Sequence, residues 1–121
     1  MINFDEFKKI EIRVGKILSA EKVPETDKLL RLMVDLGPSY VETPEGKEEK
    51  RDIRQIISGI SGYFPDCSVL VGRKSMFVAN LETRVIKGLE SQGMIFAVST
   101  DDGAFSLLSP EDNIPVGTVA K

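Results

Sequence analysis

Apolar and polar residues alternate in two segments of the N-terminal third, and this period of two limits the fold more than any other feature. Residues 30–36 read Leu-Arg-Leu-Met-Val-Asp-Leu, and residues 10–14 read Ile-Glu-Ile-Arg-Val. Successive side chains of a β-strand point to opposite faces, so this alternation predicts two half-buried strands. Arg31 is therefore expected to point outward.

Glycine and proline mark the expected ends of these strands. Gly15 is predicted to form a bulge or sharp bend in the first strand, which then continues to Val23 and stops before Pro24. Gly37-Pro38 is predicted to end the second strand, and Tyr40 to Lys50, which has no periodicity, is predicted to be a mobile loop.

The rest of the chain continues in short elements. Asn3 is suited to cap a helix over Phe4 to Lys9, and Gly59 to Gly72 has room for at most a turn or two of helix. Further strands are predicted over Arg51 to Ser58, Ser75 to Leu81 and Met94 to Ser99, and Ala104 to Leu108 is a hairpin partner after the turn Asp101-Asp102-Gly103. Short strands without alternating helices predict a small all-β barrel or sandwich, here as one domain over residues 1–121.

Net charge is −3, which by itself argues against a protein devoted to nucleic acid. Of the 16 basic and 19 acidic residues, four acids and one base lie after Val98, so the first 98 residues are neutral. A basic face on the body of the protein is therefore compatible with the composition.

Catalysis is poorly supported. The chain has no histidine, which removes the commonest general base and the commonest metal ligand, and its single cysteine, Cys67, has no adjacent base. No metal site and no cofactor are expected. No apolar run approaches the about 20 residues of a membrane span, and no secretory signal is recognisable, so we expect a cytoplasmic protein.

Five short motifs carry a resemblance to a known family. They are Phe4 to Ile17, Pro24-Glu25-Thr26-Asp27-Lys28-Leu29, Ile57-Ser58-Gly59-Ile60, Asn80-Leu81 and Gly88-Leu89-Glu90-Ser91-Gln92-Gly93-Met94. In this order and spacing the chain resembles the tRNA-binding OB-fold domain that occurs as a free-standing homodimer, at the C-terminus of methionyl-tRNA synthetases or as their separate beta chain. The resemblance extends from Phe4 to about Gly117.

The resemblance implies a five-stranded OB-fold barrel with extra C-terminal strands and a short N-terminal helix. It also implies binding of tRNA through its shape and backbone, which requires cations at phosphate spacing and a few neutral polar groups. By this resemblance, Asn80, Ser91, Gln92 and Met94 match the motif of the family's RNA-facing patch, and Lys28 matches the lysine of the Asp-Lys-Leu turn. Arg84 and Lys87 lie where the family usually has basic residues, and all seven are expected to contact RNA.

Each of these residues also has a purely structural interpretation. Lys28, Arg84 and Lys87 could be ordinary solvated charges, Asn80 could cap a turn, and Met94 could belong to the core. Gly88 and Gly93 could serve bulge geometry. Ser91-Gln92 is the strongest candidate for RNA contact, because a neutral polar pair contributes little to a core.

Two departures from the family pattern affect this expectation. The segment Glu82 to Lys87 has fewer cations than the family commonly has, which predicts weaker RNA binding. The insert Pro38 to Lys50 is longer than expected, and its cations could reach phosphate or be offset by Glu45, Glu48 and Glu49.

The sequence thus predicts a non-catalytic tRNA-binding module, homodimeric, that acts in trans with methionyl-tRNA synthetase or as its beta chain, or with another synthetase. The main alternative is a dimeric secretion chaperone of the same fold, which would bind unfolded polypeptide through apolar pockets. Those relatives generally lack the sequence Ser-Gln-Gly-Met, present here at Ser91 to Met94.

Overall fold

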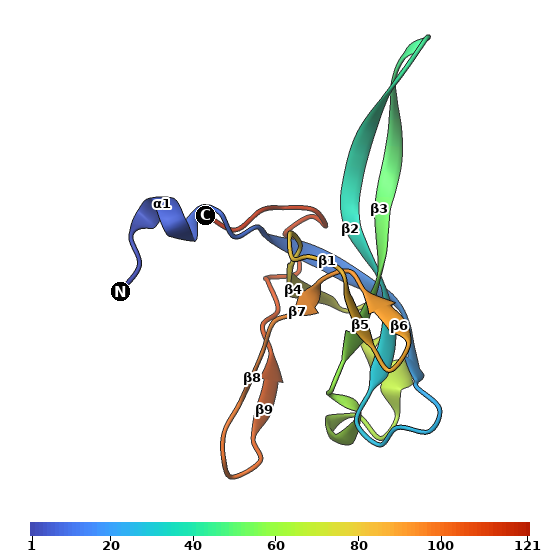
Figure 1. Ribbon diagram of the computed structural model, residues 1–121, viewed down its shortest axis with the longest axis vertical. Coiled ribbons are helices and arrows are strands. Elements are labelled where there is room, and N and C mark those ends of the chain that lie inside the picture. The colour runs from blue at the N-terminus through green and yellow to red at the C-terminus, as the bar shows by residue number, and fades with distance from the viewer.

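A curled five-stranded antiparallel sheet forms the body of the protein, as the computed structural model of all 121 residues shows (Figure 1). The strand order is β3-β2-β1-β4-β7, and two separate two-stranded hairpins, β5-β6 and β8-β9, follow in the C-terminal part. The elements in chain order are α1 (Phe4–Phe7), β1 (Ile12–Lys22), β2 (Leu30–Thr43), β3 (Gly46–Ser58), the 3₁₀ turns η1 (Ser61–Tyr63) and η2 (Cys67–Leu70), β4 (Lys74–Val78), β5 (Arg84–Ile86), β6 (Leu89–Ser91), β7 (Met94–Ile95), β8 (Ala97–Ser99) and β9 (Phe105–Leu107).

The core lies inside the curl of this sheet and contains the residues that the alternation predicts. Leu30, Leu32, Val34 and Leu36 are fully buried, and Ile17, Ile56, Leu70 and Phe77 join them. Arg31 points outward as expected, with 41% of its side chain exposed. The apolar period of two thus decides which face of β2 is buried.

The N-terminal helix begins as predicted and ends earlier. The Asn3 Oδ1 accepts a hydrogen bond from the Glu6 backbone N–H at 2.9 Å, which satisfies one free donor of the first turn. Helix α1 ends at Phe7, and none of its four residues is buried. The two short turns η1 and η2 confirm the predicted connector after β3.

Of the bulge or sharp bend predicted at Gly15, the bulge is wrong. Gly15 pairs regularly with Ser75 of β4, and the register of β1 against β2 shifts between Ile17 and Ser19 instead. A Cβ atom at residue 15 would lie 2.7 Å from the Phe77 ring and 2.8 Å from Val34. Glycine is required here because the core packs directly against the backbone.

The β2-β3 connection is also different from the prediction. The segment predicted as a mobile loop is the outer part of a long hairpin, paired from Pro38 opposite Arg51 to Thr43 opposite Gly46. Gly37-Pro38 does not end β2 but lies at a register shift after Asp35. This arm, residues 38–51, projects from one end of the molecule (Figure 1).

The C-terminal strands are shorter and more divided than predicted. The predicted strand over Met94 to Ser99 is divided into β7 and β8, and β8 pairs with β9 as expected from the turn before Ala104. The hairpin β5-β6 was not predicted. The architecture is nevertheless the expected one: a mostly-β, five-stranded antiparallel half-barrel with extra C-terminal strands and a short N-terminal helix. No helix is long and apolar enough to cross a membrane.

Candidate nucleic-acid interface

The segment Ser91-Gln92 closes the half-barrel against the free edge of β3. The Gln92 backbone N–H donates to the Gln55 carbonyl at 2.8 Å, and the Gln92 side-chain Oε1 accepts from the Gln55 backbone N–H at 3.1 Å. The Ser91 Oγ accepts from the Ile57 backbone N–H at 3.0 Å. Two side-chain oxygens therefore take the places of backbone carbonyls, so β3 has partners on this side without a regular neighbouring strand.

Ser91 is buried in this arrangement. It is 4% exposed, and its hydroxyl also donates to the Gly93 carbonyl at 3.2 Å. Ser91 does contribute to the interior, contrary to expectation for a neutral polar residue, because its hydroxyl satisfies a buried backbone donor. The observed hydrogen bonds show that this side chain stabilises the fold. Contact between Ser91 and RNA stays a prediction.

Gln92 and Met94 remain accessible on either side of Gly93. The Gln92 Nε2 makes no hydrogen bond within the chain, since only the Oε1 of this amide is engaged by Gln55. Met94 is 44% exposed although it begins strand β7. One amide donor and one flexible apolar side chain are thus free to contact a ligand.

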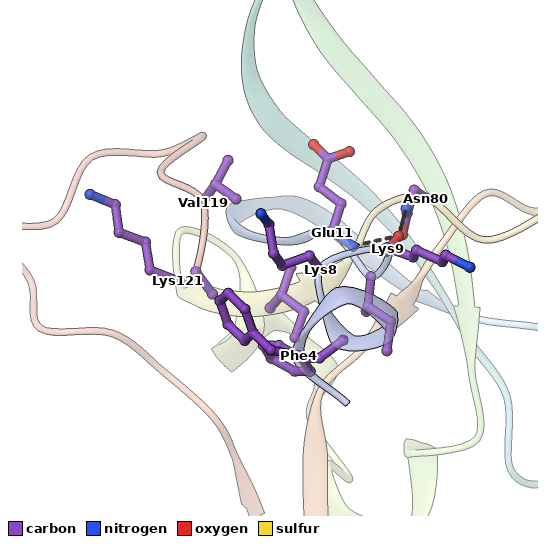
Figure 2. Close-up of a pocket in the computed structure, with 11 residues that line it drawn as sticks. Phe4, Lys8, Lys9, Glu11, Asn80, Val119 and Lys121 are labelled. Atoms are coloured by element: carbon purple, nitrogen blue, oxygen red, sulfur yellow. Dashed lines mark hydrogen bonds between the residues drawn. The ribbon is translucent and has the colours of Figure 1, made fainter. Parts of the chain in front are cut away.

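Asn80 lies after β4 and fastens the N-terminal segment. Its Oδ1 accepts from the Glu11 backbone N–H at 2.8 Å, and its Nδ2 donates to the Lys9 carbonyl at 2.6 Å (Figure 2). Both halves of the amide therefore bind backbone about 70 residues away in the sequence, as the separations of 69 and 71 show. Asn80 holds two segments together instead of capping a local turn.

Two of the predicted cations meet at one cleft. Lys28, on the β1-β2 connection, and Lys87, at the turn of the β5-β6 hairpin, line a cleft of about 380 Å³. Lys87 and Gly88 have φ values of 51° and 81°, which is the backbone of a tight two-residue hairpin turn. Both lysines are exposed and neither forms an ion pair, but Glu25 and Asp27 line the same cleft.

Arg84 lies at the open end of the same hairpin, directly opposite Ser91. It is exposed and forms no ion pair. The β5-β6 hairpin therefore connects the buried serine at one end to a free lysine at the other. Lys28, Arg84 and Lys87 are all available to an anion, and the structure brings Lys28 and Lys87 to one cleft.

Two arginines of the barrel, Arg13 and Arg54, are engaged internally. Asp52 lies between Arg13, at 3.4 Å, and Arg54, at 3.0 Å, and the hydrogen bond from Arg54 is the main cause that lowers the pKa of the Asp52 carboxyl. The Arg54 guanidinium also donates to the carbonyls of Ala79 and Gln92, the latter at 3.2 Å. Arg54 therefore holds backbone around the candidate surface, and neither Arg13 nor Arg54 is free for phosphate.

Gln55 is the residue that the sequence did not single out. Besides its backbone bonds to Gln92, its side chain accepts from the Arg31 Nε at 2.7 Å and donates to the Glu90 carbonyl at 2.8 Å. It thereby connects β2 and β6 to β3. Gln55 follows Arg54 in a strand of mixed polar residues, and no periodic pattern in this part of the sequence distinguishes it from its neighbours. No group of three or more Cys, Asp or Glu side chains is arranged to hold a metal ion.

Comparison with known proteins gives a family match over most of the chain. The family described as "Putative tRNA binding domain" matches residues 12–119. The methionine–tRNA ligase of Chloroherpeton thalassium is 42% identical over 120 residues, which are 99% of this chain and 15% of that protein. The chain thus spans about a seventh of the length of the ligases that it matches.

Solved structures of similar fold cover both branches considered above. A MetRS related protein from Pyrococcus horikoshii is 33% identical, with a TM-score of 0.81 and coverage of 100% of this chain and 98% of that one. The CsaA chaperone protein from Picrophilus torridus is 25% identical, with a TM-score of 0.78 and full coverage of both chains.

Substitution of Ser91 by Ala is expected to destabilise the protein. The buried Ile57 N–H would lose its acceptor, and an unsatisfied buried donor costs about 1–3 kcal/mol in the free energy of unfolding. Urea denaturation should show this loss. Ser99→Ala is the matched control, because Ser99 is exposed and its hydroxyl has no hydrogen bond. Equal unfolding midpoints for the two variants would contradict the assigned task of Ser91.

Proposed function

Because the chain belongs to the tRNA-binding domain family, we propose that it is a non-catalytic module that binds folded tRNA by its shape and its phosphate backbone. The observation that carries the proposal is the cleft in which Lys28 and Lys87 meet without ion-pair partners. Free cations on two different elements can contact phosphates of one backbone, and such contacts position RNA without reading its sequence. We expect the protein to act in the cytoplasm.

In this proposal the predicted site residues have three different roles. Lys28, Arg84 and Lys87 supply the electrostatic attraction, while Gln92 and Met94 contact the RNA directly through an amide donor and a thioether. Ser91 and Asn80 act by holding the surface in shape, since their polar atoms are occupied inside the protein. Glu25 and Asp27 in the cleft reduce the attraction, which is consistent with weaker binding than a lysine-rich relative would have.

Cooperation with an aminoacyl-tRNA synthetase is the finer part of the proposal. The similarity to a segment of methionine–tRNA ligases supports action in trans with methionyl-tRNA synthetase or as its beta chain. A module that binds both the enzyme and tRNA raises the local concentration of tRNA at the enzyme without any catalytic contact of its own.

A homodimer is proposed on the apolar surface formed by the two ends of the chain. Phe4, Phe7, Ile10 and Val119 are between 40% and 69% exposed and line a groove of about 460 Å³ (Figure 2). Exposed apolar groups gathered in one place are typical of an interface between subunits. A dimer would also provide two RNA-binding surfaces in one particle.

The chaperone alternative keeps some support from the fold. The likeness to the CsaA chaperone protein and the groove at the chain ends are compatible with binding of an unfolded polypeptide. The unpaired lysines of the cleft favour RNA instead, because an apolar peptide carries no negative charge to pair with them. Titration of unfolded peptide beside tRNA distinguishes the two functions.

Binding of tRNA is expected to weaken steeply with salt, and the free cations Lys28, Arg84 and Lys87 should set the slope. The triple variant Lys28→Gln, Arg84→Gln, Lys87→Gln should lower the slope of log K against log salt concentration by about two to three. Fluorescence anisotropy of labelled tRNA at several salt concentrations measures this. Lys47→Gln, at the tip of the arm, is the control and should leave the slope unchanged. Absence of tRNA binding by the unmodified protein at low salt would refute the function.

Action in trans predicts an effect that depends on tRNA concentration. Addition of the chain to methionyl-tRNA synthetase should raise the methionylation rate at tRNA concentrations below KM and leave it unchanged at saturation, because only local concentration is altered. Steady-state aminoacylation assays with and without the chain measure both rates. The same assay without any rate increase would leave the RNA-binding function intact and contradict the synthetase partnership.

Dimerisation predicts that a charge in the terminal groove separates the subunits. Phe7→Asp should halve the molar mass measured by light scattering after gel filtration, since a buried unpaired carboxylate opposes association. Val41→Asp, an apolar residue of similar exposure on the arm, should leave the mass unchanged. A monomeric unmodified protein, or an undisturbed dimer in Phe7→Asp, would show that the groove is not the interface.

A further inference from the structure

An aromatic pocket with one arginine lies outside the motifs that suggested RNA binding. It has a volume of about 270 Å³ and is lined by Tyr63, Phe64, Arg73, Phe105, Ser106 and Leu107. Three of these side chains are aromatic rings, and they come from two elements far apart in the sequence, η1 with its following residue and β9.

The rings form a fixed platform. Tyr63 and Phe105 are stacked with centroids 4.1 Å apart and planes inclined by 12°, and Phe64 meets Phe105 edge-on at 5.7 Å. Phe64 and Phe105 pack against the hydrophobic core, whereas Tyr63 remains 44% exposed. The Tyr63 ring is therefore held in place from below and is open to a planar ligand.

Arg73 gives the pocket its charge. Its guanidinium forms no ion pair and no hydrogen bond within the chain, and no acidic side chain lines the pocket. Arg73 also lines a second cavity of about 490 Å³ beside Lys74 and Ser109, in which Asp112 is the one carboxylate. Arg73 lines both cavities and is unpaired. It could therefore bind the phosphate of a nucleotide whose base occupies the aromatic pocket.

The segment that carries Tyr63 is hydrogen-bonded to the segment that carries Lys28. The Ser61 backbone N–H, two residues before Tyr63, donates to the Lys28 carbonyl at 3.0 Å. The β1-β2 connection, the 3₁₀ turns and the β8-β9 hairpin also lie at the same end of the molecule, opposite the arm (Figure 1). A nucleic acid bound at Lys28 can therefore reach the aromatic rings.

We propose that this pocket binds one unpaired nucleobase of the RNA, stacked on Tyr63, with the adjacent phosphate on Arg73. Stacking on aromatic rings tolerates any base, because every base has a π-face. The pocket would thus select for an unstacked nucleotide and not for a sequence, so it would distinguish a folded tRNA with exposed loop bases from a plain duplex. This inference rests on the proposed tRNA binding and adds a site to it.

The two tyrosines of the chain provide a direct test. Biosynthetic 3-fluorotyrosine labelling gives two fluorine NMR resonances, Tyr63 and Tyr40, which the variant Tyr40→Phe assigns. Addition of tRNA, or of oligoadenylate, should shift the Tyr63 resonance through the ring current of the stacked base, while Tyr40 on the arm stays unchanged. A blunt RNA duplex of equal charge should bind without shifting Tyr63.

Affinity measurements complete the test. Tyr63→Leu, which keeps apolar volume against Phe105, should weaken tRNA binding about five- to a hundredfold with an unchanged salt slope. Arg73→Gln should weaken it and lower the slope by about 0.7. Duplex affinity should not change in Tyr63→Leu.

The outcomes distinguish failure of the pocket proposal from failure of the proposed tRNA binding. If tRNA binds with the expected salt dependence but Tyr63 neither shifts nor matters for affinity, the pocket proposal is overturned and tRNA binding stands. A Tyr63 shift caused by an apolar peptide and not by RNA would overturn it in favour of a protein ligand. Absence of binding to every RNA would refute the proposed function itself.

Discussion

The closure of the half-barrel between β3 and the segment after β6 is the constraint on which the rest of the structure depends. At this closure, the side-chain oxygens of Ser91 and Gln92 accept hydrogen bonds from backbone N–H groups of β3. Without these acceptors the β3 donors near the core would be unsatisfied, at a cost that exceeds the net contribution of an ordinary hydrogen bond. The same closure fixes the β5-β6 hairpin, and with it the position of Lys87.

This arrangement separates the residues that shape the surface from those that can bind. Asn80, Ser91, Arg13 and Arg54 have polar side-chain atoms engaged with other parts of the chain, and these contacts stabilise the fold. Groups that remain free include Lys28, Arg84, Lys87 and Arg73, the Gln92 amide donor and Met94. In the proposed function, binding would use these unpaired groups on a rigid scaffold, which would lower the ordering cost of association.

Most of the fold followed from local pattern, and the exceptions have physical reasons. The alternation in residues 30–36 predicted the buried face of β2 because burial on one side imposes a period of two. The arm was predicted as a loop because residues 46–51 face solvent on both sides and carry charges almost throughout, which leaves no apolar period to detect. Gly15 suggested a bulge, but its role is to admit Phe77 and Val34, and close approach of distant residues has no local pattern.

The sequence by itself determined the all-β class, the core face of the strands, the absence of histidine chemistry and the family of the chain, because these depend on residue identity and short-range spacing. Only the tertiary structure decided which polar residues are occupied and which are free. It buried Ser91, tied Asn80 to residues 9 and 11, and brought Lys28 to Lys87 and Tyr63 to Phe105. These are contacts between distant segments, and their partners are set by the curl of the sheet, which no local pattern encodes.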